Sequence, residues 1–544
     1  MHIILFLGLF ALVSTVLADV TYTVIGFPDV ATNTFAVEIN KKRYPLKTSE
    51  ATLPLWSAQV ANVSASSGYR YVQLDRLNRV IAREKFLRHF TDRAATATVN
   101  EVFNRPTTIT TLPPVKQVYE DIRPEPSRAF DSSQIATIHL TPDPATFANM
   151  AQHPMDRKLK DIKAGFKFIN ADTVYSAEEV EIKTSGQASR KYQKVSMRIK
   201  FNSKKGETFF NRPIIKLRAE YVEPSVIREK LYIDILNSVG VATYQGNYVR
   251  VFVNGKPHGL YLMVEDIEEP FLMHTIHRGA IKSKKELGEL YQMGSGFEAS
   301  MVYNGSHTAD YGKIYQQKIR GDNPKDEPMK NFIAFMKDLH EWNPDQAGGV
   351  AYWNKRLDLD GYLRSMAVEY LAGAWDAAWW RGHNYFMYFN TQRKVWQFIP
   401  TDFDHTFSTG NRPGVETTYK KYNQGQVKGK FTDHPLVTKL IYRNKDINKR
   451  FEDILLTITE GIFNNEALDP LIDAYARQIE LDVAWEFSID RSDIPGRRHA
   501  WTMSDFHNSL TRPVKNVKNG LKPWITNRAQ SVPKQVGKSN VNDP

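Results

Sequence analysis

Hydrophobic and polar residues alternate along the first hundred residues with the two-residue period of β-strands. Short alternating or apolar runs at 20–27, 35–40 and 42–46 are separated by breaks that carry asparagine, glycine and proline. A stretch rich in threonine and proline follows at 105–117 and is typical of a linker or surface loop. The pattern predicts a small β-sandwich-like domain over residues 19–130.

Strand patterns continue after this domain and enclose one helical pattern. The strand candidates are 133–143, 179–186, 193–201, 212–220, 248–255 and 259–266. Apolar residues at helical spacing predict a helix over 223–240, with Ser225 as its cap and Gly240 at its end. An Asn-Gly turn signal between the last two strands predicts a hairpin. We expect residues 131–270 to form one mainly β unit.

Helical periodicity dominates the second half of the chain. The predicted helices are 330–342, 360–375, 436–443, 447–463 and 468–487, and a hairpin of strands at 384–390 and 395–400 interrupts them. We therefore expect a mostly helical unit over 271–530 and a polar tail over 531–544. Glu369, within the second of these helices, is expected on a helix surface or at a cap.

The first 18 residues, MHIILFLGLFALVSTVLA, predict a secretory signal peptide that is cleaved after Ala18. No later run is apolar enough to span a membrane, and the polar last residues lack the hydrophobic tail of a GPI signal. Glycosylation sequons begin at Asn62 and Asn304, which fits a secretory route. We expect a secreted protein that is extracellular or associated with the cell wall or spore surface.

Composition narrows the chemistry and the partners. The sequence contains no cysteine, which excludes disulfides, cysteine nucleophiles and zinc fingers. The formal net charge of +12 favours acidic partners such as anionic cell-wall polymers, phosphorylated substrates or membrane surfaces. No nucleic-acid-binding module is recognisable, so nucleic acid is not an expected partner. We expect a monomer.

Polar residues gather around the hairpin that interrupts the helices. Asp376 ends an apolar helix, Asn384 begins the hairpin, and Asp402 and Asp404 follow its second strand. Because a tight hairpin brings its two ends together, Asn384 and Asp402 are expected to be neighbours. Phosphoryl transfer needs oxygen ligands for Mg²⁺, a cation on the phosphates and a carboxylate that orients the attacking hydroxyl. These residues therefore form a candidate magnesium–ATP centre.

Three segments carry a more specific resemblance. They are VFVNGKPHGLYLMVEDIEEPFL (251–272), AVEYLAGAWDAAWWRGHNYFMYFN (367–390) and VWQFIPTDFDHTF (395–407). Their Asn-Gly…Gly-Leu-Tyr…Glu, Trp-Asp…Asn-Tyr and Pro-x-Asp-x-Asp patterns resemble the CotH kinase family, which is named for a bacterial spore coat protein. The sequence is most similar to the cell-surface CotH proteins of mucoralean fungi. The motifs cover about residues 180–410, and the N-terminal β region resembles the fungal members more loosely.

The resemblance implies roles for the residues around the hairpin. Asp376 matches the family's catalytic aspartate and Asp402 its metal-binding aspartate. Asn384 fits the second metal ligand, and Asp404 is assigned a lesser role, such as orienting a water molecule in the outer shell of the metal. The implied cofactors are ATP and Mg²⁺, with Mn²⁺ as an alternative metal. The implied reaction transfers the γ-phosphate to Ser or Thr of an extracellular or secretory-pathway protein.

The order of elements, β-rich first and helical afterwards, is also that of a protein kinase. The expected fold class is α+β, with an N-terminal β-sandwich-like domain followed by an atypical two-lobed protein-kinase-like domain. Its N-lobe is the unit 131–270, and its C-lobe is the mostly helical unit 271–530. Element order alone is weak support for function.

The expected N-lobe offers further candidates. Lys216 lies on the strand before the helix, where a kinase places its phosphate-binding lysine. Glu229, in the first half of the helix, is its expected partner, with Glu220 and Glu223 as competitors. Glu265 and Asp266 lie where the chain crosses between the lobes, near the expected position of the adenine.

The loop SGQASRK (185–191) occupies the position of the phosphate-covering loop of a kinase. It contains a single glycine, so its backbone is less suited to wrap around phosphates. Ser189, Arg190 or Lys191 is expected to compensate with side-chain contacts.

Other functions remain open at this point. The fungal relatives of the family resemble invasins that engage host-cell receptors, and the glycine- and tyrosine-rich segment 292–312 is the candidate exposed contact loop. A secreted glycosidase would use Asp402 and Asp404 as its two carboxylates. A zinc hydrolase would add His383 and His405 as ligands.

Overall fold

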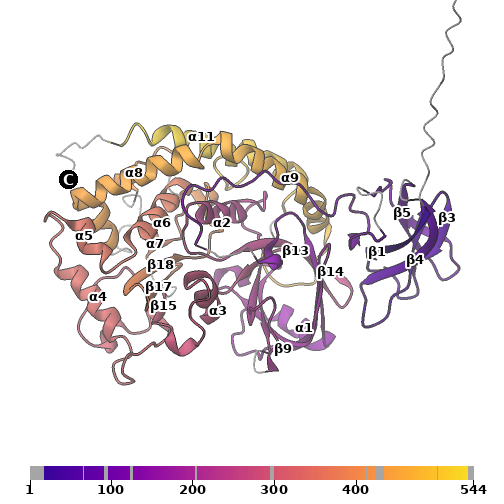
Figure 1. Ribbon diagram of the computed structural model, residues 1–544, viewed down its shortest axis with the longest axis horizontal. Coiled ribbons are helices and arrows are strands. Elements are labelled where there is room, and N and C mark those ends of the chain that lie inside the picture. The colour runs from indigo at the N-terminus through magenta and orange to yellow at the C-terminus, as the bar shows by residue number, and fades with distance from the viewer. Residues whose placement is uncertain are drawn as a thin grey trace, which may run out of the picture.

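The computed structural model (Figure 1) describes residues 17–64, 67–90, 96–122, 127–202, 205–293, 299–411, 414–422, 434–498 and 500–536. All but the last two residues of the predicted signal peptide therefore lie outside the described residues. Along the long axis of the molecule, a small β domain is followed by a β-barrel and then by a helical part (Figure 1).

The N-terminal β domain is built from a pair of small sheets. The strands are β1 (Leu17–Ile25), β2 (Thr34–Ile39), β3 (Lys42–Pro45), β4 (Leu55–Ser64), β5 (Tyr69–Leu74), β6 (Val80–Arg83) and β7 (Glu101–Val102). One sheet has the order β4-β1-β7 and the other the order β3-β2-β5-β6. Tyr22 and Trp56 from the first sheet share one apolar core with Val37 and Tyr71 from the second. The alternating pattern of this region thus buries one face of each sheet.

The strands that follow close into a barrel in the order β10-β11-β12-β14-β13-β8-β9. Their bounds are β8 (Ala136–Pro142), β9 (Ile162–Ile169), β10 (Val174–Ser185), β11 (Ser196–Phe201), β12 (Ile214–Arg218), β13 (Gly246–Val253) and β14 (Lys256–Glu265). Helix α1 (Pro144–Gln152) lies between β8 and β9 in the chain. On β12, Ile215 and Leu217 are fully buried in the barrel core. Because side chains alternate across a strand, Lys216 and Arg218 share the opposite face.

Helix α2 (Arg228–Ser238) packs its apolar residues, among them Leu231 and Ile235, into the large core of the molecule. It begins three residues later than the predicted cap. Ser225 instead donates a hydrogen bond to Glu223 (2.8 Å), so it forms a turn ahead of the helix. Gly240 follows the helix at φ +63°, a left-handed conformation that favours glycine and ends the helix as predicted.

The helical part surrounds a small sheet of order β16-β15-β17-β18. Its strands are β15 (Leu290–Met293), β16 (Tyr315–Ile319), β17 (Tyr385–Asn390) and β18 (Val395–Pro400). The helices are α3 (Glu269–Phe271), α4 (Lys330–Glu341), α5 (Gly349–Asn354), α6 (Leu359–Ala372), α7 (Ala378–Arg381), α8 (Lys445–Gly461), α9 (Asn465–Ser488), α10 (Met503–Thr511) and α11 (Leu521–Ser531). Residues Leu436–Arg443 form a π-helix. Helices α8, α11 and α9 run along one edge of the molecule above α6 and α2 (Figure 1).

The hairpin β17–β18 forms with the predicted residues and pairs Tyr385 with Pro400. Strands β15 and β16 were not predicted, and they extend the hairpin into a sheet. In the part of the chain that the structure describes, no helix combines the length and the apolar character needed to cross a membrane.

The segment 292–312, expected to be an exposed loop, is exposed only in part. Its first two residues belong to β15, and residues 294–298 lie outside the described residues. Ala299 and Met301 are fully buried, because the hydroxyls of Tyr385 and Tyr315 hold their backbone. The accessible portion narrows to about 304–310 and includes the sequon at Asn304.

Candidate active site

A polar cleft of about 590 Å³ lies between the barrel and the helical part. Segments far apart in the sequence form its walls: the loop after β10, the outer face of β12, the end of β14, part of β15, and residues on both sides of the hairpin β17–β18. Of the predicted site residues, the cleft walls contain Ser189, Lys216, Glu265, Asp376, Asn384, Asp402 and Asp404.

Asp376, Asn384 and Asp402 come together at the base of the hairpin. The backbone N–H of Thr401 donates to the carbonyl of Asn384 (2.9 Å), which closes the hairpin next to Asp402. The Asn384 side-chain amide donates to the Asp376 carbonyl (2.6 Å) and lies 3.4 Å from its Oδ2 atom. This arrangement leaves Oδ1 of Asn384 as the atom that a metal ion would use. The predicted proximity of Asn384 and Asp402 is confirmed.

Asn384 and Asp402 both adopt left-handed backbone angles, with φ of +60° and +65°. This conformation costs a residue other than glycine about 1–2 kcal/mol, although the short side chains of Asn and Asp tolerate it best. Strained backbone of this kind gathers at functional sites when the surrounding structure holds it in place. Both ends of the hairpin therefore carry local strain where they face the cleft.

The Asp376 carboxylate is held from one side. His383 Nε2 lies 3.0 Å from its Oδ1 atom and Arg381 Nε lies 3.4 Å from the same atom. Asp376 follows α6, whose end is set by Gly373 in the left-handed conformation, and it precedes the short helix α7. The contacts to Oδ1 orient the carboxylate and leave Oδ2 toward Asn384 and the cleft.

Arg218 occupies the place that the sequence assigned to Lys216. Its Nε atom lies 2.5 Å from Glu229 Oε1, and its Nη2 atom lies 2.5 Å from Asp402 Oδ1. The predicted pairing of Lys216 with Glu229 is therefore wrong. The physical reason is position along the strand: Arg218 is two residues nearer to α2 on the same face of β12 and meets the buried Glu229 carboxylate first.

Lys216 instead pairs with Asp266, with 2.6 Å between Nζ and Oδ1. Burial alone would raise the pKa of Asp266, but the charges of Lys216 and Arg198 outweigh it and lower that pKa. Lys216 lines the same cleft as the aspartates, and its role as a phosphate-binding lysine stays a prediction. Its partner is an acid at the end of β14 rather than an acid on the helix.

The side chains of Glu265 and Arg190 both form contacts within the protein. The Glu265 carboxylate pairs with Arg212 (2.6 Å) and accepts the backbone N–H of Gln245 (2.9 Å). The Arg190 guanidinium donates to the carbonyls of Gly186 and Thr184, each at 2.8 Å, and so folds back onto its own loop. Arg190 is not among the residues that line the cleft, so its expected phosphate contact is not supported, whereas Ser189 and Glu265 do line it. The expected adenine contact of Glu265 stays a prediction.

Asp402 and Asp404 differ in their electrostatics although they are two residues apart. Burial alone would raise the pKa of Asp402, but the Arg218 charge and hydrogen bond lower it overall. Burial, together with the nearby charge of Asp402, raises the pKa of Asp404 to about 6. Asp404 lies 3.9 Å from Arg218 Nη2. Asp402 is thus kept ionised, while Asp404 takes up a proton as the pH falls through about 6.

Tyr244 connects α2 to the hairpin base, and no sequence signal pointed to it. Its hydroxyl donates to Glu229 Oε1 (2.9 Å) and accepts the backbone N–H of Asp402 (3.1 Å). The strained backbone of Asp402 is therefore fixed by the same glutamate that pairs with Arg218. His383 was noticed only as a metal ligand, and its contact with Asp376 gives it a different place in the site.

The zinc alternative finds no support in the geometry. Within the described ranges, no group of three or more His, Asp and Glu side chains is arranged to hold a metal ion. His383 contacts Asp376, and the His405 ring packs against Trp375 with 4.7 Å between centroids. Asp402 and the Asn384 amide oxygen do fit Mg²⁺, which takes few protein oxygens and completes its shell with phosphate and water.

A family model described as CotH kinase protein matches residues 182–532 of the chain. The chain belongs to this family. The match begins near the end of β10 and continues through α11, so every residue that lines the cleft lies inside the family region.

The CotH chain is also similar to curated proteins from a fungus and a bacterium. It is 27% identical to the Rhizopus delemar protein named Invasin CotH3, over 93% of this chain and 83% of that protein. It is 27% identical to Spore coat protein homolog 1 of the same fungus, over 100% of this chain and 86% of that protein. Inner spore coat protein H of Bacillus subtilis is 24% identical over 55% of this chain and 76% of that protein. These names associate the family with spore coats and with invasion.

Glu369 on α6 is buried, although the sequence predicted it on a helix surface or at a cap. It is 2% exposed rather than on a helix surface, and its Oε1 atom accepts the backbone N–H of Trp379 at the start of α7 (2.6 Å). Burial raises its pKa to about 8, partly offset by hydrogen bonds from the backbone of Trp379 and Ala378. Glu369 is therefore mostly protonated at neutral pH.

This burial predicts a pH-dependent stability. Since the folded pKa is about 8 and the ordinary value is 4.5, the folded protein binds the extra proton between these pH values. Stability from this group is full below pH 4.5 and is lost as the pH rises through 8. Glu369→Gln should flatten that dependence by a few kcal/mol at most, measured by chemical denaturation at pH 5 and pH 8. The control is Glu460→Gln, the same chemical change at an exposed glutamate on α8; an unchanged pH dependence in Glu369→Gln would refute the account.

Proposed function

We propose that this CotH-family protein is a secreted kinase that transfers the γ-phosphate of ATP to Ser or Thr hydroxyls of extracellular or secretory-pathway proteins. The observation that carries the proposal is the convergence of Asp376, Asn384 and Asp402 in one cleft whose lining also includes Lys216 and Arg218. Oxygen ligands for a metal ion, cationic side chains and a carboxylate that orients the acceptor hydroxyl are the parts that phosphoryl transfer requires. The barrel and the helical part on the two sides of the cleft then correspond to the two lobes of an atypical kinase.

In this proposal Asp376 orients the acceptor hydroxyl and takes up its proton. His383 and Arg381 hold Oδ1 of Asp376, so the carboxylate presents its other oxygen to the acceptor. Asp402 and Asn384 would hold the magnesium ion, which when bound supplies neutralisation of the phosphate charge. Arg218, fixed by Glu229, keeps Asp402 ionised and places a positive charge at the phosphate end of the cleft.

The loop 185–191 contains a single glycine and can still cover the phosphates of ATP in this proposal. Arg190 rigidifies the loop from within through the carbonyls of Gly186 and Thr184. Ser189 then faces the cleft as a hydrogen-bond donor for phosphate oxygens. A rigid loop with a side-chain donor replaces the flexible glycine-rich backbone of a typical kinase loop.

Phosphate transfer tests the proposal directly. Purified protein is incubated with Mg²⁺ and γ-labelled ATP, alone and with extracellular acceptor proteins, beside the Asp402→Ala variant. We expect label on Ser or Thr of the protein or an acceptor with the native chain and none with the variant. Equal labelling by both, or no labelling by either across Mg²⁺ and Mn²⁺, would contradict the proposal.

A second candidate function is host-cell contact, which the names of the invasin relatives favour. The accessible stretch 304–310 would be the contact surface on this chain, and the receptor would be a host-cell protein. A peptide with this sequence should then compete with the protein for cell binding, whereas a scrambled peptide should not. Failure to compete would remove the loop from this role and would leave the kinase proposal untouched.

A further inference from the structure

A group of basic side chains stands beside the cleft, next to the loop 185–191. It consists of Lys191, Arg497 and Arg498, all exposed, and we call it the basic lip. Arg497 and Arg498 precede α10, more than 300 residues after Lys191 in the chain, so the fold rather than the local sequence brings the three together.

The basic lip is held in place by backbone contacts. The Arg497 N–H donates to the Lys191 carbonyl (2.7 Å), and the Gln193 N–H donates to the Arg497 carbonyl (3.1 Å). Gly496 sits at φ +127°, and a Cβ at this position would lie 2.9 Å from the Lys191 carbonyl oxygen. Only glycine permits this close approach, so the backbone at Gly496 fixes the position of Arg497 and Arg498.

Aromatic side chains connect the basic lip to the cleft. The rings of Tyr192 and Tyr221 lie 4.0 Å apart between centroids, and the Trp501 indole N–H donates to the Tyr221 carbonyl (3.0 Å). Tyr221 lines both the cleft and a small adjoining pocket of about 80 Å³. Burial and then the charge of Asp404 raise the pKa of Tyr221, which fits its position beside the acidic wall. Two tyrosine rings therefore separate the basic lip from the aspartates.

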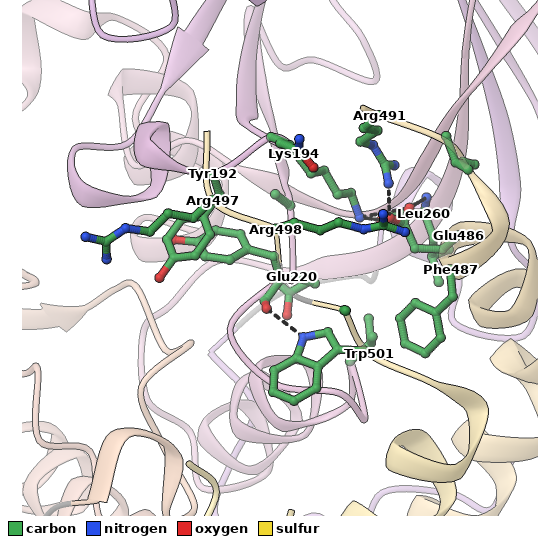
Figure 2. Close-up of a pocket in the computed structure, with 16 residues that line it drawn as sticks. Tyr192, Lys194, Glu220, Leu260, Glu486, Phe487, Arg491, Arg497, Arg498 and Trp501 are labelled. Atoms are coloured by element: carbon green, nitrogen blue, oxygen red, sulfur yellow. Dashed lines mark hydrogen bonds and ion pairs between the residues drawn. The ribbon is translucent and has the colours of Figure 1, made fainter. Parts of the chain in front are cut away.

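The side chains of the lip point in different directions (Figure 2). Arg498 extends across the small pocket toward Glu486, whereas Arg497 points out of the pocket on the side of Tyr192 (Figure 2). Glu486 already pairs with Lys194 (3.1 Å) and Arg491 (2.9 Å), so it does not neutralise the lip.

Two of the three cations of the lip are not neutralised by a neighbouring acid. Within the part of the chain that the structure describes, neither Lys191 nor Arg497 forms an ion pair. Hydrogen bonds from Ser492 are the main cause of the lowered pKa of Asp490, and the nearby charge of Arg498 lowers that pKa further. A guanidinium in a fixed position matches the geometry of a carboxylate or a phosphoryl group.

We propose that the basic lip binds acidic residues of the acceptor protein and so directs the kinase to Ser or Thr within acidic segments. The inference rests on the proposed kinase function and names its substrate class. An acceptor segment that enters the cleft beside Tyr221 passes the lip, and carboxylate or phosphorylated side chains near the acceptor hydroxyl meet Lys191 and Arg497.

Two peptides test this inference by binding and by transfer. Both carry the same central serine, one with Asp and Glu flanks and the other with Lys and Arg flanks. The native protein should bind the acidic peptide at least about tenfold more tightly, measured by fluorescence anisotropy at low salt without ATP, because several exposed charge pairs of up to about 1 kcal/mol each contribute. The double variant Lys191→Glu/Arg497→Glu should lose this preference and should show a raised KM for the acidic peptide.

The matched control is Lys41→Glu/Lys42→Glu, an equal charge change on exposed lysines of the N-terminal β domain. It should bind the acidic peptide like the native protein; equal weakening in both double variants would show a net-charge effect and overturn the inference. Equal binding of the two peptides by the native protein, or tighter binding of an anionic polysaccharide at Lys191 and Arg497, would also overturn it. If the native protein phosphorylates no peptide, the proposed kinase function fails. The anisotropy measurement then still shows whether the basic lip binds acidic peptides.

Discussion

Replacing Asp376 by asparagine is expected to lower the rate of phosphate transfer by roughly 10²- to 10⁴-fold, the usual contribution of a general base. An asparagine oxygen can still accept from His383, so the local structure and the nucleotide affinity should persist. The amide cannot take up the proton of the acceptor hydroxyl. The measurement is kcat with a saturating acceptor, together with the Kd for Mg-ATP by calorimetry.

Asp404→Asn is the matched control, because it makes the same chemical change in the same cleft. Asp404 has a raised pKa near 6 and lies at 3.9 Å from Arg218, so we expect a much smaller loss of kcat. If Asp376→Asn keeps native kcat, or if Asp404→Asn is the more damaging change, the assignment of Asp376 is wrong.

Arg218→Met is expected to destabilise the fold and abolish activity together. The variant leaves the fully buried Glu229 without its cation, and removing one partner of a buried ion pair typically costs about 3–5 kcal/mol. It also frees Asp402, whose pKa Arg218 lowers. Thermal unfolding and Mg-ATP binding should both report the loss.

Lys216→Met tests the contribution of Lys216 to nucleotide binding separately from its contribution to stability. Lys216 is partly exposed and pairs with Asp266 at the edge of the cleft, so its removal should change stability by less than about 1 kcal/mol. In the kinase account it should still weaken Mg-ATP binding severalfold. Unchanged nucleotide affinity would remove Lys216 from the site, and equal destabilisation by both variants would refute the distinct role of Arg218.

The sequence was most informative where chemistry and local geometry coincide. Asn384 and Asp402 were placed together correctly, because a hairpin with clear strand patterns on both sides fixes its own ends. The family motifs then pointed to Asp376 on the preceding helix. None of these steps required knowledge of contacts between distant segments.

The contacts of Lys216, Arg218 and Tyr244 join segments that are distant in the sequence, so no local pattern predicts them. Lys216 and Arg218 occupy equivalent positions on one face of β12, and only the placement of α2 decides which of them meets Glu229. Tyr244 reaches both Glu229 and Asp402 through a hydroxyl that periodicity treats as part of the core. The basic lip joins residues from distant parts of the chain in the same way.

Some elements were missed although a signal existed. β9 (Ile162–Ile169) alternates apolar residues at 162, 164, 166 and 168, yet it was not among the predicted strands. β15 and β16 are short, and their pairing with the hairpin rather than their own composition stabilises them. Glu369 was expected at a surface because carboxylates are rarely buried, and its hydrogen bond to the start of α7 is a tertiary contact.

The location of the metal and nucleotide tests the central claim most directly. A crystal structure with Mn²⁺ and a non-hydrolysable ATP analogue would show the metal by its anomalous signal. The account predicts a peak at ligand distance from the Asp402 carboxylate and the Asn384 amide oxygen, with the phosphates between these residues and Lys216. A metal and nucleotide bound elsewhere, with Asp402 still paired to Arg218, would contradict it.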